Sequence, residues 1–225
     1  MIFKLVIFVV LTSLQIKAEV MPFKGEFSFK GPVLTLSTVR ELTINDGVGT
    51  FDFYGKNALG NLRISSIFEN EKNVLKSMEY EFKAKAALII NRKQKLLFGD
   101  NISSSGDHTW VIESSTLDHI VLDPLTAQIQ LSLEISRGEN VITLFLPNLK
   151  NGAIEENKFE QLGTELLEID GVSYECALFQ RIRENDNRIT KYWFAKSLNY
   201  MLIKTIDVDD NGTVELAMTK LLSFG

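Results

Sequence analysis

The sequence feature that most constrains the fold is a series of short runs in which apolar and polar residues alternate with a period of two. In the clearest case in the first half of the chain, Met78, Tyr80 and Phe82 alternate with charged residues. This pattern is typical of β-strands with one buried face, because successive side chains point to opposite faces. Turn signals separate the runs, and Asp170-Gly171 predicts a two-residue hairpin. The chain is therefore expected to be mainly β.

One segment has a helical period instead. Leu125, Ile129 and Leu133 recur every four residues between Asp123-Pro124 and Gly138. Asp is a favoured N-cap, Pro fits the first helical position, and Gly is the common residue just after a helix end. The sequence predicts a single strongly curved antiparallel sheet or half-open barrel, with one main α-helix (about 123–137) packed on it.

The C-terminal strands are apolar on both faces, as Tyr192 and Phe194 on one side and Trp193 on the other illustrate. A sheet with two apolar faces has to be covered on both. The helix can cover part of one face. The rest requires closure of the sheet or a ligand.

Residues 1–18 resemble a secretory signal peptide. Lys4 gives a basic start, the apolar run from Leu5 to Leu14 is shorter than the roughly 20 residues that span a bilayer, and Ala18 ends an acceptable cleavage site. We expect residues 19–225 to form a single β-rich domain in the periplasm or outside the cell, with no membrane span after cleavage. An uncleaved anchor is the alternative.

The charge of the chain argues against a nucleic-acid partner. With 24 Lys and Arg against 29 Asp and Glu, the net charge is −5. Removal of the leader, with Lys4 and Lys17, leaves 22 cations against 29 acids, or −7. Binding of nucleic acid depends on phosphate neutralisation by Lys and Arg, which an acidic chain does not favour overall.

Four phrases suggest a family: LDPLTAQIQL at the helix, ITLFLP after it, GTELLEIDGVSYECALFQRIR, and WFAKSLNYMLIKTIDVDDNGTVELAMTKL near the end. In order and spacing they resemble the bacterial exported domain-of-unknown-function family 3108 over residues 116–222. The chain departs from that pattern at Met201-Leu202-Ile203, where a Pro often interrupts the strand. The resemblance implies a periplasmic β-rich protein, similar in shape to the half-open barrels of periplasmic lipoprotein carriers.

No catalytic constellation is evident. The chain has two histidines, His108 and His119, and no Gly-x-Ser-x-Gly motif. An enzyme would need one of these histidines to meet an acid and a nucleophile in one cleft. Cys176, the single cysteine, lies on an apolar strand face and is interpreted as a buried core residue. We therefore expect a protein that is not an enzyme.

One segment resembles the start of a calcium loop. Asp207, Asp209 and Asn211 have suitable spacing, but Met218 stands where such a loop needs its bidentate Glu. A hairpin turn explains the same residues. No metal or cofactor is expected, and these three residues remain a weak metal candidate.

The remaining candidates are aromatic. Phe27, Phe29, Phe51 and Phe53 are either core residues or the lining of an apolar cavity in the concave face of the sheet. Our leading hypothesis is a non-enzymatic cell-envelope protein that binds a lipid or other amphiphile there. The alternative is an interaction module that docks on an envelope protein or polysaccharide through its outer face.

Overall fold

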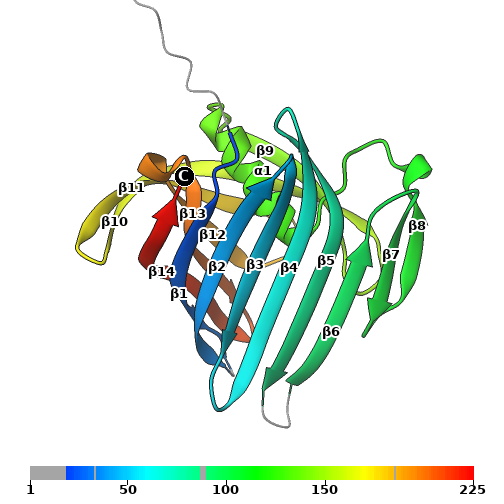
Figure 1. The fold of residues 1–225 in the computed structure, drawn as a ribbon, viewed down its shortest axis with the longest axis horizontal. Helices are drawn as coiled ribbons and strands as arrows, with labels where there is room; N and C mark the ends of the chain where they lie inside the picture. Colours follow the sequence, from blue (N-terminus) through cyan, green and yellow to red (C-terminus); the bar gives the residue numbers. More distant parts are fainter. Residues whose placement is uncertain (1–18, 33, 87–89, 185) are drawn as a thin grey trace, which may run out of the picture.

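The computed structural model describes residues 19–32, 34–86, 90–184 and 186–225, and Figure 1 shows their arrangement. The predicted signal peptide, residues 1–18, lies outside this range. In chain order the elements are β1 (Phe23–Lys30), β2 (Thr35–Asn45), β3 (Val48–Lys56), β4 (Gly60–Glu71), β5 (Val74–Ala86), β6 (Ile90–Leu97), β7 (Asn101–Gly106), β8 (Trp110–Glu113), η1 (Ser114–Thr116), α1 (Pro124–Ser136), β9 (Val141–Pro147), β10 (Ile154–Ile169), β11 (Val172–Ile182), β12 (Ile189–Ala195), η2 (Lys196–Leu198), β13 (Met201–Asp209) and β14 (Gly212–Phe224).

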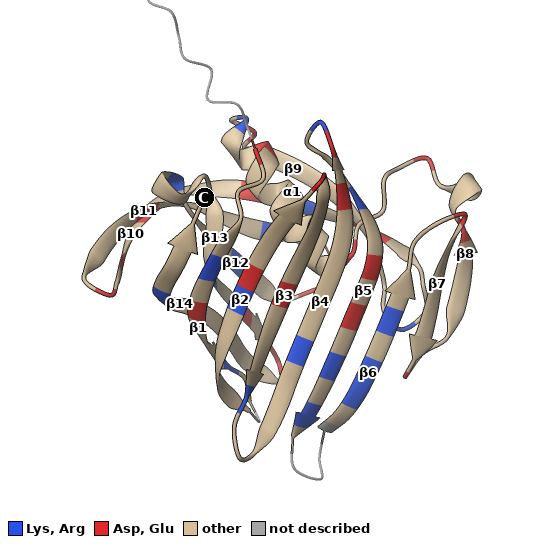
Figure 2. Cartoon of the chain, in the orientation of Figure 1, with Lys and Arg blue, Asp and Glu red and all other residues tan. Residues whose placement is uncertain are grey.

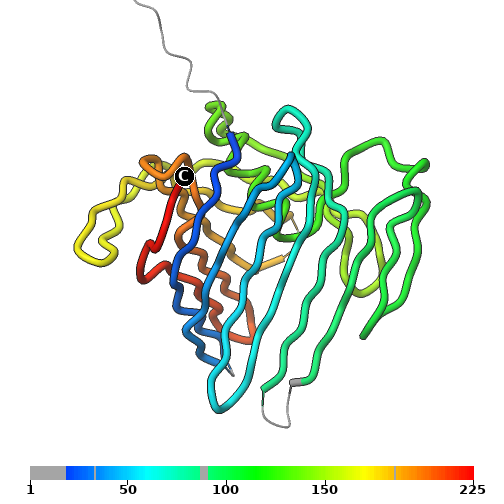
Figure 3. The backbone as a smooth tube through the Cα atoms, viewed as in Figure 1, coloured from blue at the N-terminus to red at the C-terminus, as the bar shows by residue number. Residues whose placement is uncertain are grey.

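All strands belong to one antiparallel 14-stranded sheet made of two meanders. Strands β1 to β8 pair in sequence order, as do β9 to β14, and the pairing of β1 with β14 joins the two halves. Figure 3 follows this path, with the blue and red ends of the chain side by side. The predicted mainly β fold with one helix is confirmed.

Helix α1 begins and ends where the sequence predicts. Asp123 is the N-cap, Pro124 opens the first turn, and Gly138 follows the last turn with a φ of 94°. The helix contacts β4 and β5 of the first meander and β9 and β13 of the second. In Figure 1 it lies behind β3, β4 and β5, on the concave side of the curved sheet.

The two apolar faces of the C-terminal strands are covered by the curvature of the sheet together with α1. Trp193 belongs to the same core as Phe51 and the helix residues Leu125, Ile129 and Leu133. Phe194 belongs to a second core that contains the opposite helix residues Ala127, Leu131 and Ile135. The helix therefore borders two cores, and its burial on both sides explains why its apolar stripe is so wide.

The sheet is curled but not closed by backbone pairing among the described residues, because its edge strands are β8 and β9. A side-chain hydrogen bond connects the two edges: Trp110 Nε1 on β8 donates to the carbonyl of Leu149, just after β9, at 3.2 Å. Gly152 has a φ of 79°, and a Cβ there would lie 2.8 Å from the Trp110 ring. A glycine is thus required where the indole contacts the chain.

Strand β5 differs from its predicted alternation. The register shifts between Ile67 and Phe68 of β4, which pair with Glu79 and Ser77. The residue between them, Met78, is exposed, whereas Ser77 and Tyr80 are buried. The prediction that Met78 shares the buried face was wrong, because the bulge reverses the alternation. This reversal turns the Ser77 hydroxyl toward α1.

No helix in the described part of the chain is both long and apolar enough to cross a membrane.

Candidate functional site

Among the described residues, the concave face contains one buried cation, Arg40. In β2 the inward positions are Leu36, Thr38, Arg40 and Leu42, so the arginine occupies a place in an otherwise mostly apolar series. Its side chain is 1% exposed. We did not single it out from the sequence, although its position in this alternating series was a readable signal. Arginine is rarely buried without a reason.

The guanidinium of Arg40 lies between aromatic rings and the helix. Its carbon is 5.2 Å from the centre of the Phe27 ring and 4.8 Å from that of Phe51. Nη2 donates to Oε1 of Gln128 on α1 at 2.6 Å, and Nη1 donates to the carbonyl of Leu202 at 3.3 Å. These are neutral acceptors.

Arg40 has no ion pair within the described residues, and its Nε has no hydrogen-bond partner there. Burial lowers the pKa of Arg40 to about 9, so the group still carries its charge at neutral pH. A buried charge without a counter-charge is unfavourable, because the protein interior replaces its hydration poorly. Cation–π contacts offset only part of that loss.

A small cavity of about 30 Å³ borders Arg40. Its polar lining comprises Glu19, Gln128, Ser132 and Asn199 as well as the arginine. One wall is the start of the described chain, which is held because Asn199 Nδ2 donates to the carbonyl of Glu19 at 2.7 Å. The volume suits one or two water molecules or a small group, and not an acyl chain.

The N-terminal end of α1 is fixed to the sheet by a buried carboxylate. Oδ1 of Asp123 accepts the backbone amides of Leu125 and Thr126 at 2.9 and 3.0 Å. Oδ2 accepts the hydroxyls of Ser66 on β4, Ser77 on β5 and Thr126 at 2.7, 2.6 and 2.6 Å. Asp123 is fully buried. This end of the helix is therefore anchored by five hydrogen bonds to one side chain.

The C-terminal end of α1 has weaker polar attachments. Arg137 Nη2 donates to the carbonyl of Asn73 at 2.9 Å in an exposed position. Gln130 accepts the amide of Leu75 at 3.3 Å. Because exposed polar contacts contribute little, apolar packing holds this half of the helix.

The four phenylalanines named from the sequence all lie on the concave side but form two groups. Phe27 and Phe51 contact Arg40 and are 1% and 0% exposed. Phe29 and Phe53 pack edge to face, 6.2 Å between ring centres, in a separate cluster. The structure thus brings one pair to the buried cation, and the second pair lies elsewhere in the core.

The residues of the calcium-like segment are engaged within hairpins. Asp207 binds Arg188 and accepts from Thr190 at 2.7 Å. Asp209 accepts the amide of Asn211 at 2.8 Å. Burial raises the pKa of Asp207, but the hydrogen bonds from Arg188 and Thr190 outweigh it and lower the pKa below its usual range. No cluster of three metal-ligating side chains occurs among the residues that the structure describes.

The two histidines lie in different places. His108 lies in the turn between β7 and β8. Its backbone amide donates to the side-chain oxygen of Gln94, and its carbonyl accepts from the side-chain nitrogen of Gln94. His119 is exposed and stacks on Phe145 with ring centres 4.0 Å apart. Cys176 is fully buried, as the sequence indicates, and burial raises the pKa of its thiol to about 11.

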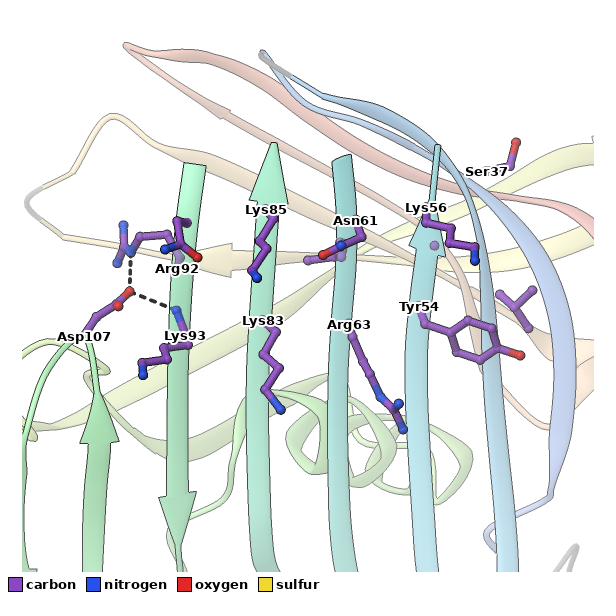
Figure 4. Close-up of a pocket in the computed structure, with 14 residues that line it drawn as sticks. Ser37, Tyr54, Lys56, Asn61, Arg63, Lys83, Lys85, Arg92, Lys93 and Asp107 are labelled. Atoms are coloured by element: carbon purple, nitrogen blue, oxygen red, sulfur yellow. Dashed lines mark hydrogen bonds and ion pairs between the residues drawn. The ribbon is translucent and has the colours of Figure 1, made fainter. Parts of the chain in front are cut away.

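A second recess lies on the opposite face of the sheet. It has a volume of about 880 Å³ and crosses the outer side of strands β2 to β6, as Figure 4 shows. We call it the outer groove; its lining residues are Ser37, Val39, Tyr54, Gly55, Lys56, Asn61, Leu62, Arg63, Lys83, Lys85, Asn91, Arg92, Lys93 and Asp107. Hydrogen bonds from Arg92 and from the Lys93 amide lower the pKa of Asp107, although burial opposes them.

Comparison with solved structures shows the fold. The chain is similar to a beta-barrel-like protein of the domain of unknown function DUF1849 from Brucella abortus, with a TM-score of 0.55 and 8% identity over 90% of this chain and 97% of that one. This likeness shows a shared architecture. At such low identity it assigns no activity.

The remaining comparisons add little. The lipoprotein LppX from Mycobacterium tuberculosis matches over 89% of this chain and 86% of that one, with 13% identity and a TM-score of 0.25, too loose to support an argument. No protein-family model and no curated protein matches the sequence, so the resemblance to the exported family 3108 stays a prediction.

Proposed function

We propose that this is a non-enzymatic protein of the bacterial cell envelope, exported by residues 1–18, that holds an acidic amphiphile between α1 and the concave face of the sheet. The observation that supports this function is Arg40, a buried guanidinium that has neutral partners only. A fatty acid or an anionic lipid would supply the missing negative charge. The apolar rings of Phe27 and Phe51 lie beside it.

The acidic head of the ligand would replace the amide of Gln128 as a partner of Arg40. A hydrogen bond between two charged groups is roughly twice as strong as one between neutral groups. A planar guanidinium also matches both oxygens of a carboxylate or phosphate. The ligand therefore recovers part of the free energy that burial of the charge costs.

The acyl chain needs more room than the cavity of about 30 Å³ offers. Ligand pockets usually measure roughly 300–1,000 Å³. Helix α1 would open from its C-terminal end, where Arg137 makes an exposed hydrogen bond, while Asp123 keeps the other end in place. Displacement of Ile129 and Leu133 would leave the apolar inner face of the sheet for the ligand. In this proposal the helix acts as the internal cover of the half-barrel.

Native mass spectrometry of protein purified gently from its own envelope, followed by solvent extraction, tests for a bound amphiphile. In parallel, dodecanoic acid and dodecanol compete with the fluorescent cis-parinaric acid. We expect Arg40→Met to lower the affinity for dodecanoic acid at least tenfold and to leave the affinity for dodecanol nearly unchanged. Lys204→Met is the matched control, because Lys204 also lies over an aromatic ring, 5.0 Å from the Trp193 centre. Absence of fatty-acid binding, or equal affinity in the Arg40 variant, would contradict the proposal.

A further inference from the structure

Six cations line the outer groove: Lys56, Arg63, Lys83, Lys85, Arg92 and Lys93. They are a quarter of the 24 Lys and Arg of a chain whose net charge is −5, and a single acid, Asp107, accompanies them in the lining. Figure 2 shows this concentration as the blue bands on β4, β5 and β6, with the red bands of β4 and β5 nearer the other end of those two strands. The separation of charge creates a local positive field on an acidic protein.

Five of the six cations lie in two rows that the strand register fixes, and Arg92, which pairs with Ala84, lies in neither. Tyr54, Arg63, Lys83 and Lys93 are successive cross-strand partners on β3, β4, β5 and β6. A second row, one pleat further along, is Lys56, Asn61, Lys85 and Asn91. Neighbouring strands are about 4.8 Å apart, so each row extends roughly 14 Å across the sheet. Figure 4 labels all four residues of the first row, and beside them Lys56, Asn61 and Lys85 of the second.

This arrangement is unfavourable for the free protein. Arg63, Lys83 and Lys93 stand directly opposite one another, and like charges in such positions destabilise a sheet. Asp52 and Glu81 relieve part of the repulsion by pairing with Arg63 and Lys83. Lys56, Lys85 and Lys93 have no ion pair among the described residues. A bound anion would neutralise what the protein leaves uncompensated.

We propose that the outer groove binds a strand of an anionic polysaccharide, one that carries carboxylate or phosphate groups along its length. Lysine and arginine would hold the acidic groups, while the amides of Asn61 and Asn91 can donate to and accept from sugar hydroxyls. Tyr54, 38% exposed at the end of the first row, offers a ring face for a sugar.

The shape of the groove favours a polysaccharide strand over a lipid bilayer. A recess of about 880 Å³ can receive a narrow chain along its floor, whereas a flat membrane surface reaches only protruding groups. This site is on the face opposite Arg40. The polysaccharide proposal is therefore independent of the amphiphile proposal above, and an experiment can refute one without refuting the other.

The test measures binding of the purified protein to hexagalacturonate and to a phosphorylated mannose pentasaccharide by calorimetry at low salt. We expect at least one of the two to bind, and Lys83→Gln/Lys93→Gln to weaken it at least tenfold. Tyr54→Ala should lower the affinity for the same oligosaccharide about threefold or more. Lys158→Gln/Lys220→Gln, two cations outside the groove, is the matched control and should leave affinity unchanged.

Folding is checked by the melting temperature. The row variant should melt at the same temperature or higher, because it removes opposed like charges. Lys85→Gln removes one unpaired cation and should lower the affinity for the oligosaccharide by a smaller factor than the row variant does. The proposal is overturned if neither oligosaccharide binds, if the control weakens binding as much as the row variant, or if phosphatidylglycerol vesicles or oligothymidine bind more tightly than both sugars.

Discussion

Asp123→Ala should lower the free energy of unfolding by about 3 to 5 kcal/mol. The substitution removes an N-cap, which contributes about 1 kcal/mol. It also removes the acceptor of three buried hydroxyls, of Ser66, Ser77 and Thr126. Ser66 and Thr126 lie 2.8 Å apart and can bond each other. About two hydroxyl donors are then left without partners, at roughly 1–2 kcal/mol each.

Urea unfolding followed by the fluorescence of Trp110 and Trp193 measures this loss. Asp123→Asn keeps an acceptor for the two helix amides but not for the three hydroxyls, so it should cost about 1 kcal/mol less than Asp123→Ala. Asp209→Ala is the matched control, because that carboxylate also accepts a backbone amide two residues on, at 2.8 Å, but in an exposed turn. It should cost about 0.5 kcal/mol or less. A loss under about 1 kcal/mol for Asp123→Ala would refute the view that this carboxylate anchors α1.

Three more predictions concern buried or paired groups. Arg40→Met should change the free energy of unfolding by less than about 1 kcal/mol, since apolar replacement of a buried charge is often neutral or stabilising; a loss above about 3 kcal/mol in urea unfolding would make the arginine structural. Burial, together with the nearby charges of Glu165 and Glu175, raises the pKa of Cys176 to about 11. Iodoacetamide at pH 8 should therefore label the native thiol at least about 100-fold more slowly than the unfolded one, and labelling within tenfold would contradict this. The pKa of Asp207 is lowered in the folded state, so it contributes stability above its unfolded pKa of about 3.9 that is lost as the pH falls through the folded value. The difference in unfolding free energy between wild type and Asp207→Asn should shrink on acidification, and a constant difference would contradict the assignment.

Local patterns in the sequence predict the elements well. Asp123-Pro124 and Gly138 mark the ends of α1, and Asp170-Gly171 adopts positive φ values of 51° and 75° in the turn between β10 and β11. These signals succeed because caps and tight turns depend on residues within one helical turn or one hairpin. The inward positions of Phe27 and Phe51 also follow from alternation.

The bulge in β5 shows where local pattern is insufficient. Alternation alone places Met78 inside, whereas the register with β4 places it outside and turns Ser77 toward Asp123. A shift of one residue reverses every side chain beyond it. The register of two strands is a property of the pair and of the core that they cover, so it is not contained in either run by itself.

By itself the sequence determined the class of the fold, the bounds of its helix and the chemical character of each strand face, because these follow from short-range propensity and periodicity. Only the tertiary structure decided that β1 pairs with β14 and that Arg40 meets Gln128 and Leu202, 88 and 162 residues away. It also aligned Arg63, Lys83 and Lys93 from three strands into one row. The physical reason is that such contacts depend on strand register and on how the curved sheet packs around the helix, which are long-range outcomes of folding the whole chain.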